Sequence, residues 1–201
     1  MSEKNVILRR IATIVLVIII MALAAYLVIR WAEQSRSELP ILGKVIPFNF
    51  VAHTGEPYGR DDMLGNITVV DFIFTRCLGP CPIMCGHMEK LYRLYASSDK
   101  IRFVSISVDP EHDSLAVLSE FAQKKGVTDK RWLFLRGNIK DVKLLSEQGF
   151  MLASDDLPGG HSTKFILVDD NGNIRGYYNG TDETSLDILK THINQLYNQL
   201  Q

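Results

Sequence analysis

The sequence has few cysteines and almost no net charge, and each shortage excludes a class of protein. Its 201 residues include three cysteines. That is too few for the disulfide framework of a small secreted protein, so the thiols suit a site better. The formal net charge is -1, without the basic excess that nucleic-acid-binding proteins carry. We therefore expect no nucleic acid partner. Internal repeats and low-complexity tracts are also absent from the sequence.

One apolar segment near the N-terminus carries no charge. Residues 11–29 read IATIVLVIIIMALAAYLVI. At ~1.5 Å per residue, a helix of this length spans the ~30 Å hydrocarbon core of a bilayer. A cleaved signal peptide is the alternative, because Ala22-Leu23-Ala24 resembles a cleavage site. Since the apolar run continues to Ile29, the sequence favours an uncleaved transmembrane anchor.

The charges around this segment predict its orientation. Basic residues lie on both sides of it, three before and two after: Lys4, Arg9, Arg10, Arg30 and Arg36. The cytoplasmic side of a span usually carries the excess of Lys and Arg, which puts the N-terminus inside and the following domain outside. Glu3 argues against a mitochondrial transit peptide, because such peptides contain few acidic residues. We expect a single-pass protein of a bacterial inner (cell) membrane, with a periplasmic or other extracytoplasmic domain.

The sequence then divides into four parts. They are a cytoplasmic N-terminus (1–10), a transmembrane anchor helix (11–30), a polar linker (31–44) and one folded domain (45–201). A domain of this size buries a core without disulfide staples.

Strand and helix patterns alternate along the folded domain. The predicted strands are 66–75, 101–108, 132–135, 164–168 and 174–178, and the predicted helices are 82–95, 113–125, 139–148 and 185–200. Asn171-Gly172 is typical of a hairpin turn between the last two strands. The order β-α-β-α-β-α-β-β-α predicts an α/β sheet with an antiparallel edge. It is the element order of a thioredoxin-like fold with one insertion.

Two cysteines lie where a buried strand meets a helix. α/β folds place their sites at such carboxyl ends of strands. Cys81 falls at the start of the predicted helix, where free N–H groups and the helix dipole stabilise a thiolate. Gly79 and Pro80 bend the loop, so that Cys77 can fold back towards Cys81. Two soft thiolates favour Cu(I), with zinc as the usual rival. Redox chemistry and a pair of ordinary buried cysteines remain open alternatives.

The third cysteine has a different setting. Cys85 lies one helical turn beyond Cys81, and free cysteine is among the most buried residue types. We expect it in the core, on the same side of the helix as Met88 and Tyr92. A third sulfur ligand or an alternative disulfide partner is the competing interpretation.

Three runs of sequence resemble the Sco/SenC family of copper chaperones. They are DFIFTRCLGPCP, SISVDPEHD and GGHSTKFILVDDNGNIRGYYNG. The resemblance extends from about Val45 to the C-terminus. It implies a membrane-anchored, thioredoxin-like protein that delivers copper to the dinuclear copper centre of cytochrome c oxidase subunit II. It also implies one copper ion, Cu(I) or Cu(II), bound by Cys77, Cys81 and His161. A separate copper-donor protein is a further expected partner. Because the two cysteines must approach to share one ion, we expect them to form a reversible disulfide without metal.

The chain departs from the family pattern at two positions and leaves one residue ambiguous. Leu78 stands where the family commonly has proline, and Cys85 is an extra thiol. Asp109 matches a family aspartate that lies near the metal loop, and capping of the following helix is the alternative. We expect His87, close to Cys85 in sequence, on the surface.

Two functions fit these residues. The first is a metallochaperone without turnover. The second is a thiol-disulfide oxidoreductase that keeps the cysteines of the oxidase subunit reduced. Both need Cys77 and Cys81, but only copper needs His161. The spacing Cys-x3-Cys is wider than the Cys-x2-Cys of thioredoxins, which favours a metal and a protein that is not an enzyme. A thiol peroxidase would use a single activated cysteine and fits the paired motif poorly.

Overall fold

The N-terminal apolar run forms a single long helix. The computed structural model describes residues 3–36, 39–154 and 157–200, and helix α1 spans Glu3–Arg36. Its stretch Arg9–Trp31 is 23 residues long, has a mean hydropathy of 3.0 and is not buried by the rest of the protein. By length and composition this stretch can cross a membrane. The helix continues to Arg36, so the first part of the expected linker 31–44 is helical.

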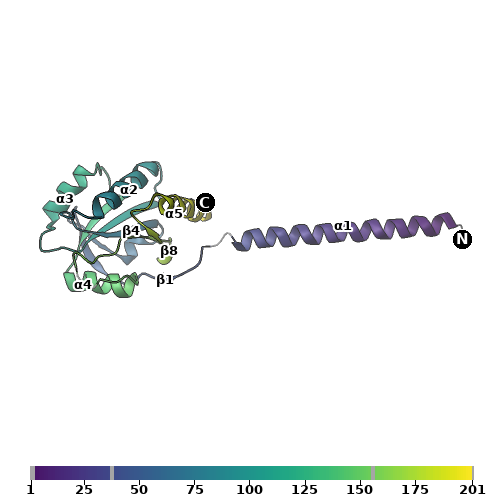
Figure 1. Cartoon of the computed structure of the whole chain (residues 1–201), viewed down its shortest axis with the longest axis horizontal. Helices are drawn as coiled ribbons and strands as arrows, with labels where there is room; N and C mark the ends of the chain where they lie inside the picture. Colours follow the sequence, from purple (N-terminus) through teal and green to yellow (C-terminus); the bar gives the residue numbers. More distant parts are fainter. Residues whose placement is uncertain (1–2, 37–38, 155–156, 201) are drawn as a thin grey trace. The chain divides into compact units, whose positions relative to one another are not determined.

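Residues 40–201 form a separate unit built on one mixed sheet (Figure 1). The eight strands lie in the order β1-β8-β7-β4-β5-β6-β2-β3. β4, β5 and β6 are parallel, and the other pairs are antiparallel. The bounds are β1 Gly43–Lys44, β2 Asn49–Ala52, β3 Pro57–Gly59, β4 Ile67–Ile73, β5 Ile101–Ser107, β6 Trp132–Arg136, β7 Lys164–Val168 and β8 Asn173–Asn179. The predicted alternation of strands and helices is therefore confirmed, with short strands added at both edges.

Those added strands were not predicted from the sequence. β1, β2 and β3 contain two to four residues each, too few for a periodic pattern to emerge. β1 pairs with β8, and β2 pairs with β6 and β3, so segments distant in the sequence complete them. The compact unit that contains these strands starts at Pro40.

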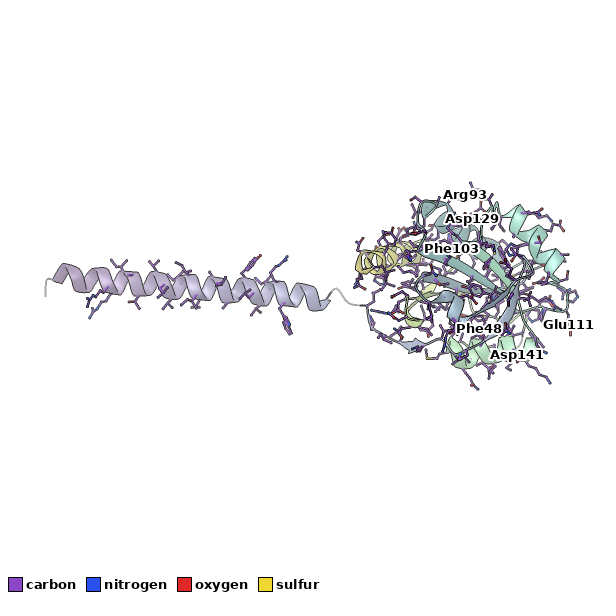
Figure 2. All side chains as sticks on the ribbon, turned by 180° about the vertical axis from the view of Figure 1, so that it is seen from behind. Phe48, Arg93, Phe103, Glu111, Asp129 and Asp141 are labelled. Atoms are coloured by element: carbon purple, nitrogen blue, oxygen red, sulfur yellow. The ribbon has the colours of Figure 1, made fainter. Side chains whose placement is uncertain are left out.

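Helices cover both faces of the sheet (Figure 1). α2 (Cys81–Leu94), α3 (Leu115–Lys124) and α5 (Glu183–Gln199) lie on one face. There Tyr92 packs on Phe103 and Phe121 packs on Phe134. α4 (Ile139–Leu144) and the π-helical turn η2 (Leu145–Gly149) cover the other face. Figure 2 shows Phe103 inside the domain, whereas Glu111 and Asp141 point outwards.

β4 lies at the centre of the sheet and is buried on both faces. All seven of its residues are buried, which explains the continuous apolar run in the sequence. Val70 and Phe72 join the core under α4. Because successive side chains of a strand point to opposite faces, Asp71 points to the face covered by α2.

The carboxyl ends of β4 and β5 bring two loops together. The parallel register pairs Ile73 with Ser107. The loop that leads to Cys77 therefore starts beside the loop that begins at Val108. Residues more than thirty positions apart meet at this edge of the sheet.

Candidate metal centre

The cysteine loop is short and ends in a helix. It leaves β4 after Ile73, and α2 begins at Cys81, with Pro80 as the N-cap and Pro82 in the first turn. The helix thus starts one residue earlier than predicted. The backbone N–H of Cys77 donates to the carbonyl of Phe74 at 3.2 Å, which turns the loop back. Cys77 is half-buried and Cys81 is buried.

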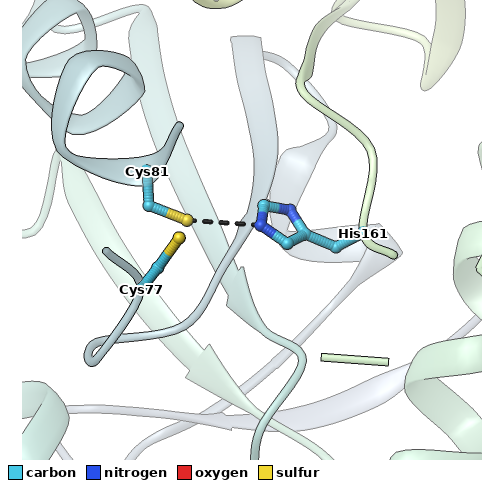
Figure 3. Close-up of side chains that lie close together, drawn as sticks. All are labelled: Cys77, Cys81 and His161. Carbon is cyan, nitrogen blue, oxygen red and sulfur yellow. Dashed lines mark hydrogen bonds between the residues drawn. The ribbon is translucent and has the colours of Figure 1, made fainter. Parts of the chain in front are cut away.

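Three side chains converge at this loop (Figure 3). The sulfur atoms of Cys77 and Cys81 and a ring nitrogen of His161 all lie within 4.8 Å of one another. The Cys81 Sγ and His161 Nε2 atoms are 3.3 Å apart. Metal bonds to sulfur and imidazole nitrogen are about 2.0–2.3 Å long, so two ligand atoms of one ion lie within about 4.6 Å. The 4.8 Å within which the three ligand atoms lie is close to that limit. The three residues predicted from the sequence are therefore brought together.

His161 is held in the orientation that a metal ligand needs. Its Nδ1 lies 3.1 Å from the carbonyl oxygen of Ser162, and because a carbonyl only accepts, Nδ1 carries the hydrogen. The ring also packs edge-on against Phe74, with centroids 5.5 Å apart. Burial lowers the pKa of His161. The neutral ring therefore directs the lone pair of Nε2 at the cysteines.

The thiol of Cys81 differs from the expectation of a stabilised thiolate. Burial raises its pKa well above the ordinary value, and the neighbouring thiol of Cys77 adds to the rise. The start of α2 was expected to lower it, but the loss of water around the sulfur has the larger effect. In the absence of metal, Cys81 is a thiol whose proton must leave when an ion binds.

Cys85 lies in the core, as predicted. Its side chain is 1% exposed, and Met84 and Met88 beside it are fully buried. All three cysteines line a cavity of about 80 Å³ together with Phe74, Phe121 and Lys125. Burial, followed by the charge of Asp71, raises the pKa of Cys85 to about 12. Within the described residues, the sulfur of Cys85 is not in the group of ligand atoms that includes His161.

Asp109 contacts the cysteine loop through Arg76 and not through a cysteine. Its carboxylate accepts a hydrogen bond from Arg76 Nε at 2.8 Å and lies 2.9 Å from His112 Nδ1. Burial raises the pKa of Asp109, but the bonds from His112 and Arg76 outweigh it and hold the pKa below its ordinary value. Ser114, not Asp109, caps the following helix.

A further buried carboxylate at the loop was missed in the sequence. Asp113 was read as the start of a helix, but it lies before α3 and is fully buried. It accepts hydrogen bonds from Thr75 and from Ser107. The sequence offered one signal for Asp113. It lies in the run SISVDPEHD, which also contains Asp109, the residue already expected near the metal loop.

The prediction that His87 is a surface residue is wrong. The side chain is 6% exposed. Its Nδ1 lies 2.9 Å from the carbonyl of Gly180, and its Nε2 lies 3.2 Å from a carboxylate oxygen of Glu183. The chain around the start of α5 covers this turn of α2. Because the covering residues are more than ninety positions away, the pattern of α2 alone did not indicate it.

Comparison with known proteins identifies the family. The model of the SCO1/SenC family matches residues 41–196. The chain belongs to the SCO1/SenC family. A relative from Bacillus subtilis (strain 168), described as a SCO1 protein homolog, is 31% identical over 154 residues, which are 74% of this chain and 80% of the relative.

Solved structures of SCO1/SenC proteins share the fold. A SCO1/SenC family lipoprotein from Bacillus anthracis str. Ames is 31% identical, with a TM-score of 0.71 over 79% of this chain and 97% of that one. BsSco, a member of the Sco family of cytochrome c oxidase assembly proteins in which a disulfide switch was identified, is 28% identical with the same TM-score and coverage. Yeast Sco1 with copper bound, at 23% identity and a TM-score of 0.59 over 78% and 95% of the chains, has the same fold. The predicted thioredoxin-like α/β fold is confirmed.

Proposed function

We propose that the chain is a membrane-anchored copper chaperone that carries one copper ion between Cys77, Cys81 and His161. The convergence of the two sulfur atoms and the ring nitrogen within 4.8 Å carries this proposal. Membership of the SCO1/SenC family supports it.

The donor set explains the choice of metal. Two thiolates are soft ligands suited to Cu(I), and the imidazole adds a ligand that Cu(II) prefers. Structural zinc sites use four protein ligands, whereas among the described residues the group at this site has three. Copper is the cargo, and we propose that it is bound in either oxidation state.

The proposed acceptor is the dinuclear copper centre of cytochrome c oxidase subunit II. Support comes from BsSco, which belongs to a family of cytochrome c oxidase assembly proteins. Cys77 is half-buried rather than buried, and Leu78 beside it is 99% exposed. An incoming ligand can therefore reach the ion from the side of Cys77 while Cys81 and His161 still hold it. Loading requires a separate copper-donor protein.

Copper transfer tests this function. Full-length protein in detergent, loaded with Cu(I), is mixed with the metal-free copper domain of subunit II, and the copper on each protein is measured after separation. We expect wild type and Cys85→Ala to deliver copper. Cys77→Ser should deliver none, because a hydroxyl is a hard and weakly acidic ligand. A wild-type protein that binds copper but never transfers it would contradict the delivery role.

A thiol-disulfide oxidoreductase is the second candidate. The observation in its favour is a partly exposed thiol, Cys77, beside a buried one, Cys81. In this reaction the two thiols become the Cys77–Cys81 disulfide, and the disulfide of the oxidase subunit becomes two thiols. The neighbouring His161 has no part in that exchange, so its replacement separates the two functions.

We also propose that α1 anchors the protein in a bacterial inner membrane with its N-terminus in the cytoplasm. The stretch Arg9–Trp31 is long enough to span a bilayer, and Lys4, Arg9 and Arg10 precede its apolar centre. The domain would then lie in the periplasm or another extracytoplasmic space.

A C-terminal reporter fusion tests this orientation. Alkaline phosphatase, which folds only where disulfides form, is expected to be active, and a cytoplasmic fluorescent reporter is expected to be dark. A matched variant with Lys4, Arg9 and Arg10 replaced by glutamine should weaken the bias. The opposite pattern in the wild type would reverse the proposed topology.

A further inference from the structure

Asp113 is the polar centre of the two loops that meet beside the metal centre. It is fully buried. Its Oδ2 accepts hydrogen bonds from the backbone N–H of Thr75 at 3.2 Å and from the hydroxyl of Ser107 at 2.6 Å. Its Oδ1 accepts from the hydroxyl of Thr75 at 2.5 Å. Every hydrogen bond described for this carboxylate thus comes from the ends of β4 and β5.

These contacts bear on Cys77 because of where Thr75 lies. Thr75 follows the last residues of β4 and precedes Cys77 by two positions. Beyond the strand, the backbone N–H of Thr75 is satisfied by Asp113, which fixes the direction in which the chain leaves the sheet. A charged acceptor makes shorter and stronger hydrogen bonds than a neutral one.

The same network holds the next residue of the loop. The hydroxyl of Ser107 donates to Asp113 and accepts the backbone N–H of Asp109 at 3.1 Å. Asp109 in turn holds the side chain of Arg76. Thr75 and Arg76, the two residues before Cys77, are therefore both held by one buried network that follows β5. Thr75 is 38 positions from its partner, and Arg76 is 33 positions from its own.

We propose that Asp113 is a positioning residue of the metal centre, which sets the place of the Cys77 sulfur relative to Cys81 and His161. The inference rests on the proposed copper function. It also concerns a property independent of copper: how often the two thiols come within bonding distance. Loss of the carboxylate frees the start of the loop, while the Cys81 side chain stays fixed by α2.

The test compares Asp113→Asn with Asp169→Asn in the full-length protein in detergent. Asp169 is 2% exposed and accepts hydrogen bonds from Asn171, Asn173 and Arg175 at the β7–β8 turn. It is an equally buried and well-bonded carboxylate outside the cysteine loop. Its variant reports what a general loss of stability does to the site.

Two measurements are made on each variant. Cu(II) titration followed by sulfur-to-copper charge-transfer absorption should show affinity about 10–100-fold lower in Asp113→Asn, as for loss of an outer-shell partner, with an altered band. Equilibration with glutathione buffers should show the Cys77–Cys81 disulfide less stable relative to the dithiol. Asp169→Asn should leave the spectrum, affinity and disulfide equilibrium at the wild-type values.

The two proposals fail in different ways. If wild type binds no copper, the chaperone function falls, and the disulfide equilibrium alone still decides the role of Asp113. An Asp113→Asn protein that matches Asp169→Asn in every measurement overturns the positioning role. If Asp113→Asn does not fold, Thr75→Val, which removes one hydroxyl donor and keeps the shape, should shift the same quantities in the same direction. Wild-type values in folded Thr75→Val would then overturn the proposal.

Discussion

Replacing His161 with alanine is expected to lower the affinity for Cu(II) by more than about 100-fold, beyond the 10–100-fold typical of losing an outer-shell partner. The charge-transfer absorption should disappear at copper concentrations that saturate the wild type. His161 supplies the only nitrogen in the described group of ligand atoms, and Cu(II) prefers imidazole to a purely sulfur site. Cu(I) should persist in part, because both soft thiolates remain.

The same variant separates the two candidate functions. Thiol-disulfide exchange uses the two sulfurs alone, so any reductase activity of the wild type should survive in His161→Ala. The matched control is His192→Ala, since His192 lies on α5 and contacts the hydroxyl of Tyr178. Unchanged Cu(II) binding with an unchanged spectrum in His161→Ala would exclude it as a ligand. A wild type that binds no copper but reduces disulfides rapidly would favour the oxidoreductase.

The second large effect expected is a loss of stability as the pH rises from about 4 to about 7, caused by Asp71. Its carboxylate is fully buried, and among the described residues no group reaches either oxygen with good hydrogen-bond geometry. Burial raises its pKa from the ordinary 3.8 to about 7, and the hydroxyl of Ser105 beside it in β5 offsets only part of the rise. The native state thus keeps a proton that the unfolded chain has already released.

The sign and size follow from proton linkage. Where the unfolded state binds fewer protons, the free energy of unfolding falls as pH rises. With ~1.4 kcal/mol for each pKa unit, ionisation of Asp71 costs on the order of 4 kcal/mol by pH 7.5. The cost is absent below the unfolded pKa and constant above the native one. Other carboxylates, such as Asp169 with its lowered pKa, have the opposite dependence at lower pH.

A difference between two proteins isolates this contribution. Chemical denaturation of reduced, metal-free wild type and Asp71→Asn is measured at pH 4.5 and pH 7.5. Relative to the wild type, the variant should gain stability on going to pH 7.5, because asparagine does not titrate. Asp141→Asn, an exposed α4 control, should show no such gain. An equal difference between Asp71→Asn and wild type at both pH values would contradict the buried, protonated carboxyl.

Local pattern was sufficient to predict the cysteine loop and the main elements around it. The apolar run of β4, the Gly79-Pro80 bend and Pro82 at the start of α2 all act within a few residues of Cys77 and Cys81. Gly126 has a φ of +73° just beyond the end of α3, a conformation that glycine adopts without strain. His161 alone gave a weak signal in the sequence, and the family resemblance, not its local pattern, pointed to it as a ligand.

Other features depended on partners distant in the sequence, and only the tertiary structure decided them. His87 is buried because Gly180 and Glu183, on another part of the chain, cover it. β1 and β2 exist because β8 and β6 complete their hydrogen bonds. Asp71 is one polar residue in an apolar strand, and its pKa is raised because the folded domain buries it completely.

The sequence by itself therefore determined the apolar N-terminal helix, the α/β order and the two cysteines, because helix period, strand period and turn chemistry act over short stretches of chain. The tertiary structure decided the 3.3 Å approach of His161 to Cys81 and the hold of Asp113 on Thr75. The first contact joins residues 80 positions apart, and the second joins residues 38 positions apart. Such contacts form only when the parallel pairing of β4 with β5 and the antiparallel pairing of β4 with β7 set the strand ends side by side.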